Sequence, residues 1–201
     1  MTTGPAVPSV GHDPEYPIVT ERLFLRPIEP SDAVAMHAYK SNPEVVRYVP
    51  YAPLELADVE GRIGTTWSNT RLAAEGDAVC LAVEERRTGS LIGDVVLFWR
   101  SETDRSGEVG YIFDPRAAGR GYATEAVRAL LALGFDGLGL HRIVARIDER
   151  NTSSARVAER LGFRREARLV ESEWFKGEWA TLLVYALLEH EWREHSAATD
   201  A

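Results

Sequence analysis

Apolar and polar side chains alternate along several short runs of the chain, and this alternation predicts strands. In residues 108–113 the apolar side chains of Val109, Tyr111 and Phe113 fall at every second position. A period of two is typical of a strand, because successive side chains point to opposite faces of a sheet. Similar runs bounded by turn-forming residues predict further strands over residues 22–26, 78–83, 91–99, 142–148, 164–174 and 179–187.

One segment follows the period of a helix instead. Ala123, Ala126, Val127, Leu130 and Leu131 recur at spacings of three and four residues and form a single apolar stripe. The order of strands, helix, strand, helix and strands predicts an α/β (α+β) fold, with a mixed, mostly antiparallel central sheet flanked by helices. Further helices are expected after Pro30-Ser31-Asp32, over residues 56–74, from the N-cap Asn151, and near the C-terminal end.

The composition is that of one globular domain. The chain has 201 residues, of which 45% are hydrophobic and 27% are charged, and a domain usually takes about 150 residues. We expect a single domain over residues 17–195. Residues 1–16 are rich in Pro, Gly, Ser and Thr and are expected to form a disordered leader, and residues 196–201 a flexible tail.

Several classes of protein are disfavoured by the composition. The single cysteine, Cys80, cannot form an internal disulfide, and its place in an apolar strand predicts a buried thiol. No run approaches the roughly 18 apolar residues of a membrane span, and Met1–Tyr16 lacks the features of a signal peptide, so we expect a cytoplasmic protein. The net charge of −8 disfavours nucleic-acid binding through a basic face. The five histidines form no metal-binding motif, so no metal is expected.

The segment between residues 113 and 122 joins the end of a predicted strand to the start of the predicted central helix. Backbone N–H groups at a helix N-terminus attract phosphate, and Gly119 and Gly121 allow a close approach of the backbone to an anion. Arg116 and Arg120 add positive charge. The segment lacks the Lys of a P-loop and the third Gly of a dinucleotide-binding motif, so another phosphorylated cofactor is indicated.

The spacing Arg116-x-x-Gly119-x-Gly121 is the R/Q-x-x-G-x-G/A motif of the GCN5-related N-acetyltransferases (the GNAT superfamily). The chain resembles this superfamily over nearly its whole ordered length. Within it, the chain looks like the branch of ribosomal-protein N-acetyltransferases (RimJ/RimL-type). The other segments that carry the resemblance are Asn151–Ser154, Arg160–Phe163, Thr20–Arg26 and Val184–Leu187.

The resemblance implies where acetyl-CoA binds. The fourth and fifth strands of the family, here residues 108–113 and 142–148, splay apart and hold the pantetheine arm, while the following loop holds the pyrophosphate. The oxyanion of the transfer reaction needs a donor, for which the backbone N–H of Ile112 or Phe113 is the candidate. The cofactor-binding residues implied by position are Tyr111, Ile112, Phe113, Arg116, Gly119, Arg120, Gly121, Tyr122, Ala123, Asn151 and Ser154.

Transfer of acetyl to an amine needs a base, because an amine that resembles Lys has a pKa of about 10. Many members of the superfamily protonate the departing thiolate with a Tyr seven residues after the Asn, where this chain has Ala158. In the ribosomal-protein branch a Ser is the proposed acid, and by position that role falls to Ser154. Glu173 is the first candidate for the general base, through a water, and Glu108 on the splayed strand is the second.

The acceptor site lies in the part of the chain with the weakest motifs. Aromatic side chains from two segments are candidates for its wall, namely Tyr48, Tyr51, Trp67, Trp174 and Trp179. An alternative for Trp174 and Trp179 is a hydrophobic cluster that closes the sheet. Glu171, Glu173 and Glu178 are expected to make the acceptor side acidic, which would suit a protonated amine.

The sequence and the resemblance together predict an acetyl-CoA-dependent N-acetyltransferase that transfers acetyl directly to an amine. A protein N-terminal α-amine is the preferred acceptor. A small amine, such as an aminoglycoside, a polyamine or an amino acid, is the first alternative. The second alternative is a non-catalytic acyl-CoA-binding sensor, and a homodimer is a further hypothesis.

Overall fold

An eight-stranded sheet runs through the protein, with its strands in the order β1-β2-β3-β4-β5-β6-β8-β7. The computed structural model describes residues 14–199. Only β5 and β6 are parallel neighbours in this sheet, so the expected mixed, mostly antiparallel sheet flanked by helices is confirmed. The strands are β1 (Ile18–Val19), β2 (Leu23–Pro27), β3 (Ala78–Glu85), β4 (Ser90–Ser101), β5 (Ser106–Phe113), β6 (Arg142–Asp148), β7 (Arg164–Phe175) and β8 (Glu178–Leu188). The helices are α1 (Ala33–Lys40), α2 (Leu56–Ile63), α3 (Tyr122–Ala132), α4 (Thr152–Arg160) and α5 (Glu189–Thr199).

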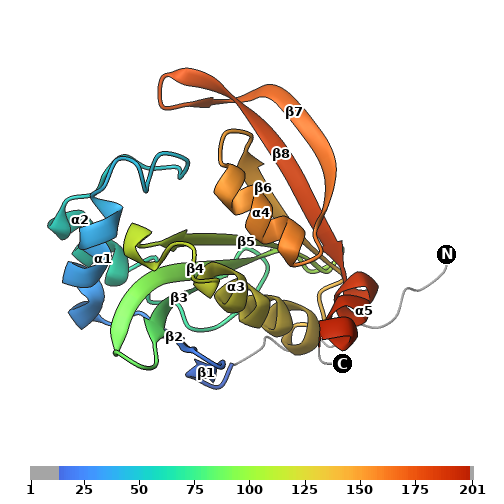
Figure 1. Ribbon diagram of the computed structural model, residues 1–201, viewed down its shortest axis with the longest axis horizontal. Helices are drawn as coiled ribbons and strands as arrows, with labels where there is room; N and C mark the ends of the chain where they lie inside the picture. The colour runs from blue at the N-terminus through green and yellow to red at the C-terminus, as the bar shows by residue number, and fades with distance from the viewer. Residues whose placement is uncertain (1–13, 200–201) are drawn as a thin grey trace.

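Strand β3 separates two hydrophobic cores. Val79, Leu81 and Val83 belong to a core that includes the apolar stripe of α3, whereas Cys80 and Ala82 belong to a core with α1 and α2. The division follows from the strand period, which sends successive side chains to opposite faces. Figure 1 shows α3 lying across the sheet and α1 and α2 at the left of the view. Cys80 is a buried thiol as predicted, and burial raises its pKa, which disfavours the nucleophilic thiolate.

The two strands expected to splay do so. β5 and β6 pair only where Ser106–Glu108 lie beside Arg142–Val144. Beyond that point β6 continues along β8, while residues 109–113 of β5 keep β4 as their partner. The β5 backbone therefore has no strand beside it on the β6 side over residues 109–113, and its polar groups there are open to a ligand.

The prediction of a helix over residues 56–74 is wrong beyond Ile63, where α2 ends. Gly64 is the C-cap of α2, and the N–H groups of Thr65 and Trp67 both donate to the carbonyl of Arg62. Glycine and threonine are weak helix formers, so the chain reverses here instead of continuing the helix. The reversal brings the ring centroid of Trp67 to 5.7 Å from the Arg62 guanidinium carbon.

Strands β7 and β8 form a long hairpin that extends beyond the rest of the sheet (Figure 1). Near its tip Trp174 and Trp179 pack edge to face, with ring centroids 5.3 Å apart, and both rings are more than half exposed. The two rings therefore form a cluster at the hairpin tip, as the alternative predicts, and this cluster is exposed.

Both ends of the described chain belong to the fold. The Tyr16 hydroxyl donates to the carbonyl of Thr70 at 3.0 Å, and α5 continues through Thr199 into the segment expected to be a tail. Residues 1–13 and 200–201 of the expected leader and tail lie outside the described residues. Between residues 14 and 199, every helix is too short or too polar to cross a membrane.

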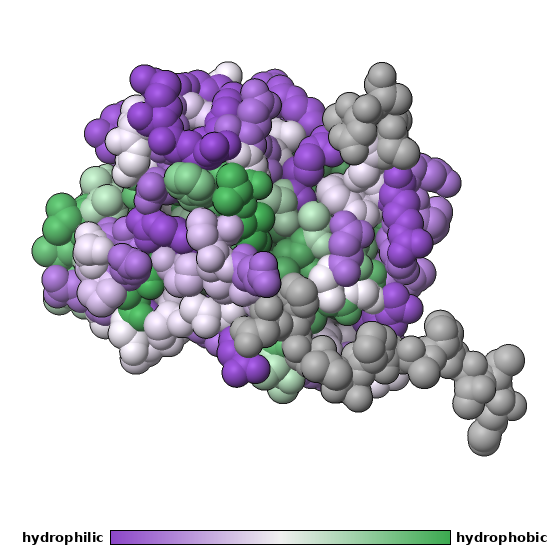
Figure 2. All heavy atoms as spheres, turned by 90° about the horizontal axis from the view of Figure 1, so that it is seen from below, coloured by the Kyte–Doolittle hydropathy of each residue, from purple (hydrophilic) through white to green (hydrophobic). Residues whose placement is uncertain are grey.

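Figure 2 shows one face of the molecule, where hydrophilic side chains border a band of apolar ones.

Candidate active site

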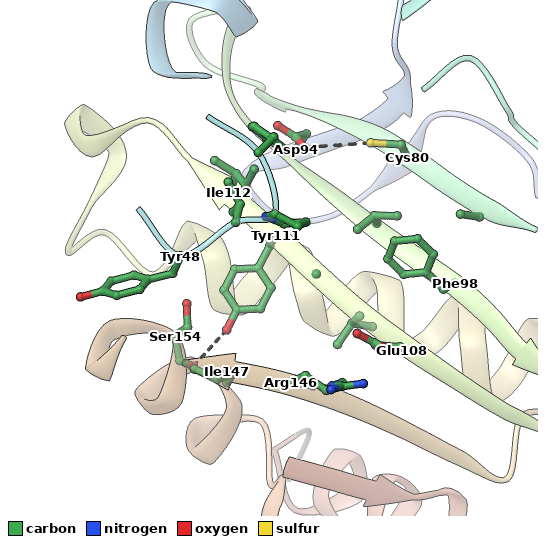
Figure 3. Close-up of a pocket in the computed structure, with 18 of the residues that line it drawn as sticks. Tyr48, Cys80, Asp94, Phe98, Glu108, Tyr111, Ile112, Arg146, Ile147 and Ser154 are labelled. Carbon is green, nitrogen blue, oxygen red and sulfur yellow. Dashed lines mark hydrogen bonds between the residues drawn. The ribbon is translucent and has the colours of Figure 1, made fainter. Parts of the chain in front are cut away.

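Two cavities share part of their walls along β5. The first, which we call the aromatic cavity, has a volume of about 430 Å³ and lies between α2, β4, β5 and β6 (Figure 3). The second, the helix-end cavity, has a volume of about 530 Å³ and lies at the N-terminus of α3. The residues that line both cavities, which we call the shared wall, are Tyr48, Val49, Tyr111, Ile112, Asn151 and Ser154.

The helix-end cavity is built from backbone donors. Gly121 is the N-cap of α3 with a φ of 78°, and no side chain caps the helix there. Gly119 has a φ of 74°, so both glycines hold a left-handed conformation that other residues rarely adopt. The first N–H groups of a helix have no partner within the helix, and Tyr122, Ala123 and Thr124 line the cavity. This arrangement fits the phosphates of a nucleotide cofactor.

The cations at this cavity are not the two expected from the sequence. Arg116 folds back onto Asp114, with an Nη2–Oδ2 distance of 2.5 Å, and Arg120 pairs with Glu85 at 3.0 Å; neither lines the cavity. Arg156 and Arg160 of α4 do line it. Sequence reasoning missed both, although their four-residue spacing after Asn151 places them on one face of a helix.

Glu85 holds the start of α3 in place. Its Oε1 accepts from the Tyr122 hydroxyl at 2.5 Å and from Arg120 at 3.0 Å, and its Oε2 accepts from the Thr88 hydroxyl at 2.7 Å. The Tyr122 and Thr88 hydrogen bonds, with the charge of Arg120, lower the pKa of Glu85 to about 2. The carboxylate therefore ties the end of β3 to the N-terminus of α3.

The low pKa of Glu85 makes stability depend on pH. In an unfolded chain a glutamate has a pKa of about 4.3, so the ionised group stabilises the fold above that pH and its contribution is lost as the pH falls toward 2. We expect Glu85→Gln to lower the free energy of unfolding at pH 7, with a difference from the unmodified protein that shrinks between about pH 4.5 and 2. Urea unfolding at several pH values measures this. Glu60→Gln, at an exposed position of α2, is the control, and an equal loss at pH 7 and pH 3 for Glu85→Gln would contradict the assignment.

The shared wall is held together across the splay. The Asn151 side chain accepts from the N–H of Ser154 at 3.1 Å, which confirms its predicted role as the N-cap of α4. The Tyr111 hydroxyl of β5 donates to the carbonyl of Ser154 at 3.0 Å. Burial raises the pKa of Tyr111 to about 12, so its hydroxyl stays protonated as a donor. Figure 3 shows the Ser154 hydroxyl pointing toward β5, where the two cavities meet.

A buried ion pair forms part of the lining of the aromatic cavity. Lys40 Nζ lies 2.7 Å from an Asp94 carboxylate oxygen, and the Tyr39 hydroxyl donates to the same carboxylate at 2.7 Å. Burial alone would lower the pKa of Lys40, but attraction to Asp94 outweighs it and the pKa is raised. Sequence reasoning missed this pair. The available signal was a carboxylate in the middle of an apolar strand, since buried charges are paired.

The two candidate bases lie in different places. Glu108 lines the aromatic cavity, is largely buried, and accepts from Arg100 Nε at 3.0 Å. Figure 3 shows its side chain and that of Arg146 beside the opening between β5 and β6. Glu173 does not line this cavity; it pairs with Arg146 at 2.5 Å from β7 and is about twice as exposed as Glu108.

Only some of the expected acceptor residues line the aromatic cavity. Tyr48, Tyr51 and Trp67 do. Trp174 lines an adjoining hollow, which shares Pro50 and Tyr51 with the aromatic cavity, and Trp179 lines neither space. The cavity is not acidic as expected, because Glu171 and Glu178 lie outside it. The positively charged side chains of its lining are Lys40, Arg62, Arg100 and Arg146. The negatively charged ones are Asp94, Glu108 and Asp148. Within residues 14–199, no three His, Cys, Asp or Glu side chains are placed to hold a metal ion.

Residues 22–164, which include both cavities' strands and the loop before α3, match the family model described as Acetyltransferase (GNAT) domain. The chain belongs to the GNAT acetyltransferase family. It is therefore an N-acetyltransferase, and acetyl-CoA is the acyl donor that members of this family use. The glycine loop, the uncapped helix and the open edge of β5 fit that donor's phosphates and pantetheine arm.

The relatives of this GNAT protein whose descriptions name an acceptor do not all name the same one. It is 33% identical over 175 residues to the uncharacterized N-acetyltransferase YnaD of Bacillus subtilis, covering 87% of this chain and 98% of that protein. A solved structure from Vibrio cholerae, provisionally described as a ribosomal-protein-serine acetyltransferase, is 29% identical with a TM-score of 0.73, covering 87% and 99%. The spermidine N(1)-acetyltransferase of Escherichia coli is 27% identical, covering 84% and 87%.

Proposed function

We propose that this protein transfers acetyl directly from acetyl-CoA to a primary amine while both substrates are bound. The observation that carries the proposal is the shared wall, since it lets two ligands in separate cavities meet at Tyr111 and Ser154. The helix-end cavity takes the phosphates of acetyl-CoA, and the aromatic cavity takes the acceptor. Bringing two reactants together in this way removes much of the entropic cost of the reaction.

On the donor side, backbone and cationic groups bind and orient. The N–H groups at the start of α3 hold the pyrophosphate, and Arg156 and Arg160 add positive charge beside it.

Of the two expected oxyanion donors, we choose the N–H of Phe113. The N–H of Asp114 donates to the carbonyl of Ile92 on the β4 side. Successive N–H groups of a strand point to opposite sides, so the N–H of Ile112 also faces β4 and that of Phe113 faces the open edge. The Ser154 hydroxyl donates a proton to the departing thiolate.

On the acceptor side, a carboxylate must remove the proton of the amine. Glu108 is our first choice, because it lines the cavity that receives the amine. Arg100 pairs with this carboxylate at 3.0 Å and orients it. Glu173 is the alternative base. It is paired with Arg146, which lines the cavity, and it would reach the amine through a water.

The acceptor that we propose is the α-amine of a protein N-terminus. The Vibrio cholerae relative described for ribosomal-protein serine supports it. So does a further hollow of about 570 Å³ that shares Pro50 and Tyr51 with the aromatic cavity and offers room for the residues after the first. A polyamine, suggested by the spermidine acetyltransferase relative, suits the site less well, because its positive charges would meet Arg62, a lining cation with no carboxylate partner among residues 14–199.

An acceptor panel tests the function. The purified protein with acetyl-CoA is offered peptides with a free N-terminus, spermidine, an aminoglycoside and single amino acids, and free CoA thiol is measured. We expect thiol release that depends on a peptide amine, with the acetyl group found on the α-nitrogen by mass spectrometry. CoA binding without release above hydrolysis on any amine would instead support a non-catalytic sensor.

Two further expectations stay proposals. We place the protein in the cytoplasm. We also propose a homodimer, in which a second copy covers apolar side chains that the β7–β8 hairpin exposes, namely Leu169, Val170 and Trp179. Light scattering in solution measures the molecular mass of the protein, and a value of one chain instead of two would contradict the homodimer.

A further inference from the structure

Two cations lie against the same two aromatic rings in the aromatic cavity. Lys40 Nζ is 4.6 Å from the ring centroid of Trp67 and 5.8 Å from that of Tyr51. The guanidinium carbon of Arg62 is 5.0 Å from the Tyr51 ring and 5.7 Å from the Trp67 ring. Both side chains line the cavity. The rings therefore hold two positive charges close to the space that receives the acceptor.

Only one of these two cations has a carboxylate. Lys40 is buried and paired with Asp94 at 2.7 Å. Arg62 is half-buried and forms no ion pair with any carboxylate among the described residues 14–199. The other charged side chains of the lining are occupied as Arg100–Glu108, Arg146–Glu173 and Asp148–Arg150 pairs. Arg62 is thus the cation of this cavity that lacks a counter-ion within the described chain.

The chemistry of Arg62 favours a carboxylate as that counter-ion. A guanidinium remains charged at all physiological pH values and presents a planar set of donors that matches a carboxylate. Stacking on Tyr51 and Trp67 limits the rotation of the planar group, so less entropy is lost when a ligand binds. The same charge repels acceptors whose remote groups are cationic.

We propose that Arg62 selects acceptors that carry a carboxylate close to the reacting amine. The inference rests on the proposed function, because it assigns the aromatic cavity to the acceptor. The carboxylate has two sources, an acidic side chain at the N-terminus of a peptide or the α-carboxylate of a free amino acid. In either case it pairs with the Arg62 guanidinium while the amine lies at the shared wall.

Matched acceptors test the proposal. Peptides of sequence Asp-Ala-Ala-Tyr and Asn-Ala-Ala-Tyr, both with amidated C-termini, differ only in the side-chain carboxylate. Free glutamine and glutaminamide differ in the α-carboxylate, which is an amide in the second. We expect the carboxylate member of at least one pair to have a kcat/KM about 10- to 100-fold higher, the range of a charge-assisted hydrogen bond. The pair that shows the preference identifies the source.

Variants of Arg62 assign the preference to this residue. Arg62→Gln should remove it by raising KM for the carboxylate acceptor about 10- to 100-fold, with kcat and the neutral acceptor little changed. Arg62→Lys should restore part of it. Arg128→Gln on α3, outside the cavity, is the control and should behave as the unmodified protein.

The outcomes separate this inference from the proposed function. If neutral and carboxylate amines are acetylated equally well, or if Arg62→Gln weakens all acceptors equally, the inference is overturned while the acetyltransferase activity stands. If no amine is acetylated although CoA binds, the proposed function fails. A preference for spermidine that Arg62→Gln strengthens would also overturn the inference and assign a polyamine.

Discussion

Replacing Glu108 by Gln is expected to lower kcat for acetyl transfer about 100- to 10,000-fold, the usual contribution of a general base. The substitution keeps the shape of the side chain and removes only its ability to accept a proton. Glu108 lines the aromatic cavity and not the helix-end cavity. The affinity for CoA, measured by calorimetry, should therefore change little while steady-state kinetics report the loss.

The pH profile distinguishes a base from a merely structural group. At high pH the amine loses its proton without help, so the deficit of Glu108→Gln should shrink as the pH approaches about 10. Glu173→Gln is the matched comparison, since Glu173 lies outside the cavity and contacts Arg146. A larger and pH-dependent loss in Glu173→Gln than in Glu108→Gln would reverse our assignment.

Asp94→Asn is expected to destabilise the fold by about 3–5 kcal/mol, the cost of leaving one partner of a buried ion pair alone. Lys40 and Asp94 are both nearly inaccessible to solvent. The Tyr39 hydroxyl donates to the same carboxylate, so the substitution also weakens a buried hydrogen bond. Urea unfolding at pH 7 measures the change in free energy.

A second substitution tests whether the unpaired charge of Lys40 causes this loss of stability. Lys40→Met in the Asp94→Asn background removes the unpaired charge, and a well-packed apolar replacement of a buried pair is often close to neutral. We expect the double variant to recover a large part of the stability lost by Asp94→Asn alone. If the two effects simply add, the Lys40–Asp94 pair is not the source of the loss.

Local pattern predicted the elements to which the family resemblance assigns the cofactor. The strand over residues 142–148 and the helix after residue 122 were placed nearly to the residue, because their apolar periods extend over several turns or pleats. The loop with Gly119 and Gly121 was found for a local reason too, since its positive φ angles require glycine. The helix over residues 56–74 failed where Gly64 offered an equally local reason to end it.

The sequence predicted least well which charged side chains line each cavity. Arg116 and Arg120 were expected to bring positive charge to the cofactor, but the structure pairs them with Asp114 and Glu85, and neither lines the helix-end cavity. Arg156 and Arg160 line the helix-end cavity instead. A long side chain can reach several neighbours, and sequence position alone does not say which carboxylate is nearest.

The sequence by itself determined the class of fold, the family resemblance and the glycine loop before α3, because each depends on residues that are neighbours along the chain. Only the tertiary structure decided the character of the aromatic cavity. It joins Lys40 from α1 to Asp94 from β4, brings Arg62 from α2 onto Tyr51 and Trp67, and places Glu108 inside and Glu173 outside. Charges act through space and are paired across elements, so their balance in a cavity is known only once the chain has folded.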